Sequence, residues 1–165
     1  MSDLEMGWID EKMWWIDEDK LAGSPNPPLE ELERLRHTGF ATIVCLLHPD
    51  DSPPQQPAYD PADAGRLGYA WHNIPVLDYH APTLDQFHEF RSIAEAGLER
   101  GKLLVHCWAG QGRTGTMGAA YWIFKSMSAA DAVARVRRAN PKAIESLDER
   151  ATLDSLAARL GAGGG

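Results

Sequence analysis

Residues 103–124, LLVHCWAGQGRTGTMGAAYWIF, decide the fold, because a buried strand, a glycine-rich turn and an apolar helix follow one another there without interruption. The helix, expected at 114–127, is apolar on nearly every side, which indicates that other elements cover it. The turn fits two kinds of site. One is a G-x-G-x-x-G dinucleotide loop running from Gly110 to Gly115, and the other is an anion-binding turn between a cysteine and an arginine.

The rest of the chain alternates between strand patterns and helix patterns. Apolar runs predict strands at 13–17, 41–47, 69–76 and 102–107. Capping and stop signals predict helices at 28–39, 83–101, 128–138 and 146–160, and stretches rich in proline predict loops at 22–28 and 48–65, the second with at most one helical turn. This order indicates an α/β fold with a central, mostly parallel sheet flanked by helices. We expect a single domain over residues 1–160 and a flexible Gly-rich tail at 161–165.

Composition excludes several classes of protein. The formal net charge of -8 leaves no broad basic face for nucleic acid or for an anionic membrane. No apolar run is long enough to cross a bilayer, and the N-terminus is acidic where a signal peptide would be basic, so we expect a cytoplasmic protein. The two cysteines, Cys45 and Cys107, do not have the spacing of metal ligands, and we expect neither a metal nor a cofactor. Whether these two thiols can pair with each other stays open.

The dinucleotide hypothesis fits the turn poorly. That fingerprint belongs on the first βαβ unit, with an acidic residue about 20 positions further on at the end of the next strand. Here earlier strands have already passed, and the acid at that distance, Asp131, falls in a helix just after its Ser128 cap. An ATP-type phosphate loop is also disfavoured, because it requires a lysine and none occurs between Lys102 and Lys125.

The anion-binding hypothesis uses the same residues more completely. A cysteine at a strand end, followed by a glycine-rich turn and a helix N-terminus, lies in an electropositive site that favours the thiolate. Arg113 offers a planar fork for two phosphate oxygens, and the turn's backbone N–H groups can hold the others. Attack by Cys107 on phosphorus would leave a phosphocysteine, and Thr114 could donate a hydrogen bond to the sulfur as it departs.

His106-Cys107 and the turn that follows resemble the H-C-x-x-G-x-x-R-[ST] signature of the cysteine-dependent protein tyrosine phosphatase superfamily, in particular its small dual-specificity members. The resemblance extends over most of residues 13 to 155. It implies that Cys107 is the nucleophile, Arg113 the phosphate clamp, Thr114 the aid to the leaving sulfur, and His106 a residue that steadies the loop or is purely structural. The phosphate-binding loop it implies comprises His106, Trp108, Ala109, Gly110, Gln111, Gly112 and Arg113.

Cleavage of a phosphate ester also requires a general acid. The resemblance places an aspartate on the loop after the preceding strand, where Asp78 stands, before the Pro82-Thr83 helix start. Asp85 is the alternative, although an acid in the first turn of a helix is explained by the helix dipole alone. We therefore predict Asp78 as the general acid.

Two residues depart from the family pattern in the last segment. Glu149 stands where many relatives carry glutamine, and Asn140 stands where a basic residue often precedes the proline. If Glu149 lies near the site, it adds negative charge beside a dianionic substrate.

The loop side chains bear on the substrate. Relatives that hydrolyse phosphoinositides tend to carry lysines in the loop, whereas Trp108, Ala109 and Gln111 are uncharged. We therefore expect a monomeric phosphatase acting on a phosphorylated protein or peptide, with phosphotyrosine and phosphoserine/threonine both open. A phosphoinositide or inositol phosphate phosphatase and a phosphate-binding module with weak or no turnover are the alternatives.

Overall fold

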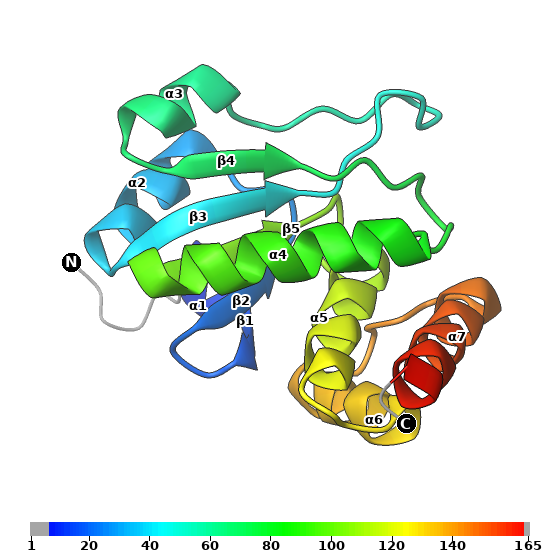
Figure 1. Ribbon diagram of the computed structural model, residues 1–165. Coiled ribbons are helices and arrows are strands. Elements are labelled where there is room, and N and C mark those ends of the chain that lie inside the picture. Colours follow the sequence, from blue (N-terminus) through cyan, green and yellow to red (C-terminus); the bar gives the residue numbers. More distant parts are fainter. Residues whose placement is uncertain (1–6, 164–165) are drawn as a thin grey trace.

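A five-stranded sheet forms the centre of the structure, a computed structural model that describes residues 7–163 (Figure 1). Its spatial order is β1-β2-β5-β3-β4, with β1 antiparallel to β2 and the other three pairings parallel. The strands are β1 (Trp14–Asp17), β2 (Leu21–Ser24), β3 (Phe40–Cys45), β4 (Ala70–Asn73) and β5 (Lys102–His106). The predicted α/β class with a mostly parallel sheet is confirmed.

Helices cover both faces of this sheet, and α4 crosses it in front in Figure 1. The helices are α1 (Trp8–Lys12), α2 (Leu29–His37), α3 (Pro61–Arg66), α4 (Leu84–Arg100), α5 (Gly112–Phe124), α6 (Ala129–Ala139) and α7 (Leu147–Gly163). One core joins the sheet to α4, α5, α6 and α7, and a smaller core joins it to α2 and α3. Within residues 7–163, no helix has both the length and the apolar character needed to span a membrane.

The predicted capping signals operate as expected. Thr83 and Gln86 form a capping box at the start of α4, and Ser128 accepts a hydrogen bond from the backbone N–H of Asp131 at the start of α6. Helix α5 is buried along nearly its whole length, from Gly112 to Ile123. The sequence signals therefore located the helices that support the turn after β5.

One prediction about a loop was wrong, and the predicted flexibility of the tail stays a prediction. The stretch 22–28 was expected to be a loop, but most of β2 lies in it and all four β2 residues are buried between β1 and β5. Pairing on both sides outweighs the weak strand preference of its small residues. Helix α7 continues to Gly163, through the first residues of the tail predicted to be flexible, and the last two residues lie outside the described part.

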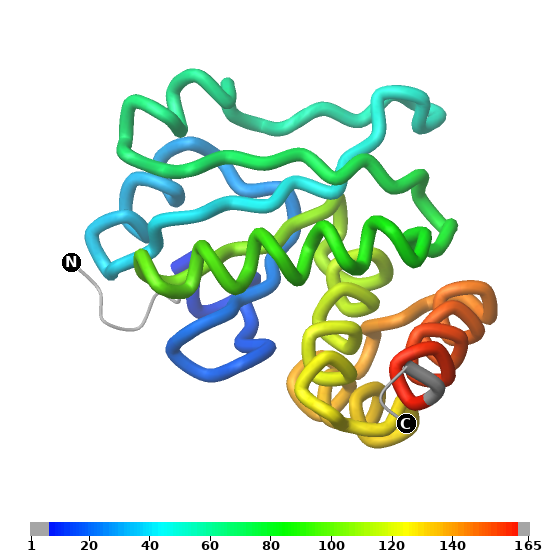
Figure 2. Tube along the Cα trace, in the orientation of Figure 1, coloured from blue at the N-terminus to red at the C-terminus, as the bar shows by residue number. Residues whose placement is uncertain are grey.

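The parallel strands direct three loops toward one end of the sheet. Figure 2 shows that the segments after β3, β4 and β5 leave the sheet at the same end, on the side where α5 begins. The segment after β3 is irregular until α3, as predicted for 48–65. Ligands of parallel sheets bind at this end, so the three loops form the candidate site.

Candidate active site

The turn between β5 and α5 is built around the N-terminus of a buried helix. Within the described chain, the backbone N–H groups of Gly112, Arg113 and Thr114 have no backbone acceptor, as expected for the first turn of a helix. Gly110 has φ 77°, and a Cβ there would lie 2.4 Å from the backbone N of Pro25. Glycine is required at this position because both the dihedral angle and the space exclude a side chain.

Cys107 lies at the base of this turn and is 2% exposed. Its Sγ accepts hydrogen bonds from the backbone N–H of Gly110 at 3.2 Å and from the hydroxyl of Thr114 at 3.0 Å. Two donors on one sulfur stabilise negative charge there, as a nucleophilic thiolate requires. The structure thus brings Cys107 and Thr114 together as the sequence predicted.

Arg113 is 2% exposed and is held by residues of the loops after β3 and β4. Its Nη1 donates to Asp51 Oδ2 at 3.1 Å and to the Val76 carbonyl at 2.8 Å. Its Nη2 donates to Gln55 Oε1 at 2.8 Å and lies 3.5 Å from Asp78 Oδ1. The Nε–H is buried and has no partner among the described residues.

Asp78 lies beside the guanidinium, on the loop after β4, and its side chain is 31% exposed. Its backbone N–H donates to Asp51 Oδ1 at 2.8 Å, and its Oδ2 accepts from Gln55 Nε2 at 3.2 Å. Asp85, the alternative, is an exposed residue in the first turn of α4. The structure therefore brings Asp78 to the predicted clamp.

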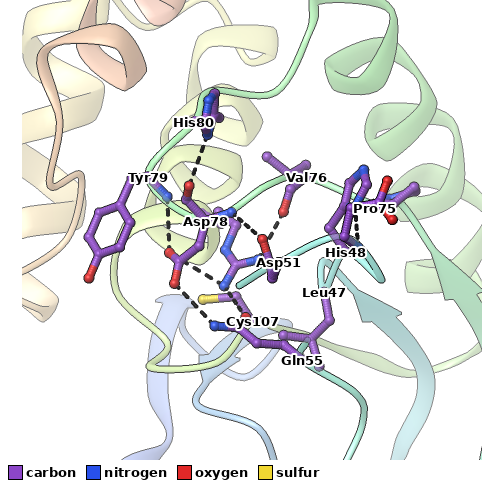
Figure 3. A network of polar contacts seen from close by, with 12 residues as sticks. Leu47, His48, Asp51, Gln55, Pro75, Val76, Asp78, Tyr79, His80 and Cys107 are labelled. Atoms are coloured by element: carbon purple, nitrogen blue, oxygen red, sulfur yellow. Dashed lines mark hydrogen bonds and ion pairs between the residues drawn. The ribbon is translucent and has the colours of Figure 1, made fainter. Parts of the chain in front are cut away.

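Asp51 and Gln55 are site residues that the sequence reasoning missed. Both come from the proline-rich segment after β3, which gave no pattern beyond irregular structure. Asp51 is 5% exposed, and its two oxygens bind Arg113 and the Asp78 backbone (Figure 3). The position of Asp51 soon after β3 was a signal that could have identified it, because acids that follow a parallel strand lie at the ligand-binding end of the sheet.

His106 supports the turn through a chain of hydrogen bonds. Trp71 Nε1 donates to the Tyr59 hydroxyl at 2.8 Å, and that hydroxyl lies 2.7 Å from His106 Nε2. Complete burial lowers the pKa of His106 from 6.5 to about 4, so the imidazole is neutral at pH 7. We assign its proton to Nδ1, which lies 3.3 Å from the Cys107 carbonyl oxygen.

The carbonyl of Gly110 is fixed from the opposite side of the turn. It accepts hydrogen bonds from Trp14 Nε1 at 3.0 Å and from Asn140 Nδ2 at 3.4 Å. Asn140, one of the two departures from the family pattern, therefore contacts the phosphate-binding loop. Trp108 is 50% exposed and Ala109 is exposed, so these loop side chains face outward.

Glu149, the second departure, packs against the loop from behind. Its Oε1 accepts from the backbone N–H groups of Glu145 and Ser146 at 3.0 and 2.9 Å. The backbone N–H of Glu149 donates in turn to Ser146 Oγ at 3.1 Å, which completes a capping box at the start of α7. A Cβ on Gly112 would lie 3.1 Å from Glu149 Oε2, so the carboxyl group is next to the loop backbone. Burial raises the pKa of Glu149 above its usual value.

Cys45 is a buried residue of β3 whose thiol has no hydrogen bond to Cys107 or Arg113 in the described chain. It is aligned with His106 in the pairing of β3 and β5, and Cys107 packs in the core on the α5 side of the sheet. Burial raises the pKa of Cys45 to about 11, so its thiol is neutral. Both cysteines are free. Across residues 7–163, no three His, Cys, Asp or Glu side chains are grouped as a metal site requires.

The sequence and fold are similar to known phosphatases. A crystal structure described as Tk-PTP in the active form is 30% identical, with a TM-score of 0.80 over 90% of this chain and 98% of that one. Protein tyrosine phosphatase domain-containing protein 1 of Mus musculus is 30% identical over 146 residues, 79% of this chain and 19% of that protein. A phosphatidylinositol 3,4,5-trisphosphate 3-phosphatase and protein-tyrosine-phosphatase, PTEN1, of Arabidopsis thaliana is 30% identical over 139 residues, 79% of this chain and 33% of that protein.

These curated relatives are much longer than the chain, which spans a third or less of their length. The family profile described as PTP-SAK, Swiss Army Knife protein, DSP-PTPase phosphatase domain, matches residues 10–153 and therefore includes the turn, its supporting strands and the Asp78 loop. On this match, and on the likeness to Tk-PTP, the chain belongs to the PTP-SAK family, within the cysteine-dependent protein tyrosine phosphatase superfamily of the small dual-specificity type.

Proposed function

We propose that the chain hydrolyses phosphate monoesters of proteins through a phosphocysteine intermediate. One observation supports this most strongly: a sulfur that accepts two hydrogen bonds lies at the base of a turn in which three backbone N–H groups, and the Nε–H of the adjacent guanidinium, have no acceptor among residues 7–163. These donors match the oxygens of a phosphate dianion.

In the first half of the reaction, the thiolate of Cys107 attacks phosphorus and an S–P bond forms. The bond from phosphorus to the ester oxygen breaks, and that oxygen takes a proton from Asp78. Arg113 and the N–H groups of the turn hold the other phosphate oxygens while negative charge is redistributed. The products of this half are the free alcohol or phenol and a phosphocysteine.

In the second half, water attacks the same phosphorus atom and gives a proton to the Asp78 carboxylate. The S–P bond breaks, inorganic phosphate leaves, and the sulfur recovers its negative charge. The Thr114 hydroxyl, 3.0 Å from Sγ, stabilises that charge as it develops. Cys107 and Asp78 thus return to their starting protonation states.

The loop side chains favour a phosphoprotein substrate. Trp108, Ala109 and Gln111 are uncharged, so a polyphosphorylated head group would find no further cation on the loop itself. The half-exposed Trp108 ring offers an aromatic surface beside the phosphorylated residue. A phosphoinositide substrate is the second candidate, because the name of the Arabidopsis relative includes both activities.

The test is release of phosphate from a small aryl phosphate, with a chelator present. We expect Cys107→Ser to abolish turnover and Asp78→Asn to reduce it strongly. Phosphotyrosine and phosphoserine peptides are then compared with a soluble phosphoinositide at equal concentration. Unchanged turnover in Cys107→Ser would end the proposal, faster release from the phosphoinositide would favour the second candidate, and phosphate binding without turnover would indicate a binding module.

A further inference from the structure

The hydrogen bonds of Arg113 within the described chain use three of its five N–H groups. A guanidinium has five N–H bonds, two on each terminal nitrogen and one on Nε. The two on Nη1 are directed to Asp51 and the Val76 carbonyl, Nη2 donates one hydrogen bond to Gln55 at 2.8 Å, and its contact with Asp78 at 3.5 Å is an ion pair without a hydrogen bond. Only Nε has no partner in the described chain. A phosphate that binds side-on, through Nε and Nη2, therefore approaches the nitrogen to which Gln55 is already hydrogen-bonded.

We propose that the side-chain amide of Gln55 is the group displaced, and that it stands in for a phosphate oxygen while the site is empty. This inference rests on the proposed function. The Gln55 carbonyl oxygen accepts a hydrogen bond from Arg113, as a phosphate oxygen would. The amide N–H of Gln55 donates a hydrogen bond to Asp78 Oδ2 at 3.2 Å (Figure 3). Gln55 therefore competes with the substrate for the clamp and lowers the affinity of the site for phosphate.

The contact with Asp78 leads to the same conclusion. Asp78 Oδ1 faces Arg113 and accepts the N–H of Tyr79 at 3.0 Å, so Oδ2 is the oxygen left to carry the proton for the leaving group. While the Gln55 amide donates a hydrogen bond to Asp78 Oδ2, that oxygen acts as an acceptor and cannot give a proton in the same direction. Gln55 must therefore release Oδ2 before Asp78 can give a proton to a leaving group in that direction.

Gln55 and Asp51, which both accept hydrogen bonds from Arg113, differ in how deeply their side chains are buried. The Asp51 side chain is 3% exposed, and both of its oxygens are bound, so it fixes the guanidinium. Gln55 is only partly buried, and the residues on either side of it, Pro54 and Gln56, are exposed. An amide at the edge of the site can rotate into water and exchange its hydrogen bonds there.

The experiment compares Gln55→Ala with Gln56→Ala, a matched change at the exposed neighbouring position. Binding of inorganic phosphate is measured by calorimetry, and its inhibition constant is measured with a small aryl phosphate. We expect Gln55→Ala to tighten phosphate binding by about threefold to tenfold, because a hydrogen bond to a charged group no longer has to be broken. Gln56→Ala should bind phosphate like the wild type.

A second variant should change the affinity for phosphate in the opposite direction. Gln55→Glu places a carboxylate against Arg113, which should strengthen the competitor and weaken phosphate binding. Unchanged or weaker binding in Gln55→Ala, or no binding in either the wild type or Gln55→Ala, would overturn the inference. Calorimetry requires no turnover, so it separates this failure from a failure of the proposed function, and thermal unfolding of each variant shows that the fold is retained.

Discussion

Replacing His106 with glutamine should remove a large part of the acid sensitivity of the fold. In the folded chain the pKa of His106 is lowered to about 4 by complete burial, whereas an unfolded histidine titrates near 6.5. The unfolded chain therefore binds more protons as the pH falls below 6.5. The stability that the neutral imidazole contributes is complete above that value and is lost as the pH falls toward 4.

The size of the effect follows from the two pKa values. Their difference, about 2.5 units, corresponds to a limit of about 3.4 kcal/mol, of which about 2 kcal/mol is lost by pH 5. Urea unfolding at pH 8 and pH 5 measures the loss in free energy of unfolding. The wild type should lose about 2 kcal/mol more than His106→Gln between these two values. An exposed histidine provides the control, and His37→Gln should lose as much as the wild type.

Equal losses in the wild type and in His106→Gln would refute the reasoning, because the carboxylates common to both proteins would then explain the whole pH dependence. Comparing two proteins at two pH values cancels those carboxylates, Glu149 included. A pH-dependent loss in the His37→Gln control that differs from the wild type would show that the comparison does not isolate His106.

Three further predictions concern the network around the sulfur and the guanidinium. Asp51→Asn should lower the free energy of unfolding by roughly 3 kcal/mol and reduce aryl phosphate turnover, because it breaks the buried ion pair with Arg113. Asp50→Asn, at an exposed position, is the control, and equal effects of the two substitutions would contradict the role given to Asp51. Thr114→Val should slow breakdown of the phosphocysteine, roughly a hundredfold, so that stopped-flow records show a burst of released alcohol. Thr114→Ser should restore turnover, and the absence of a burst in Thr114→Val would argue against a role of the Thr114 hydroxyl in the departure of the sulfur. Because burial raises the folded pKa of Glu149, its stabilising contribution is present at low pH and lost as the pH rises; Glu149→Gln should therefore gain stability relative to the wild type at pH 7 but not at pH 4, as unfolding in urea would measure.

The part of the site that depends on local sequence could be predicted. Cys107, Arg113 and Thr114 lie within one turn, and the strand before it and the helix after it fix their relative positions. Asp78 was predicted from its place after β4, and the structure puts it 3.5 Å from Arg113. The relative positions of residues in a contiguous strand, turn and helix are determined mainly by local sequence, so they can be predicted without knowing the rest of the fold.

The remainder depends on contacts between distant segments. Asp51 is 62 positions from Arg113, and nothing in its proline-rich surroundings indicates that its carboxyl group is buried. Likewise, β2 forms because β1 and β5 pair with it, and its own four residues carry only a weak strand signal. Tertiary context decided both features, and a single sequence does not show which segments will meet.

The carboxylate of Asp51 has a mechanical consequence. One of its oxygens binds the guanidinium and the other binds the backbone at Asp78, so a single rigid group joins the clamp to the loop that carries the proton donor. A displacement of that loop would therefore move the guanidinium with it or break one of these two hydrogen bonds. If the proposed function holds, a substitution that loosens either contact of Asp51 should impair both proton donation by Asp78 and phosphate binding by Arg113.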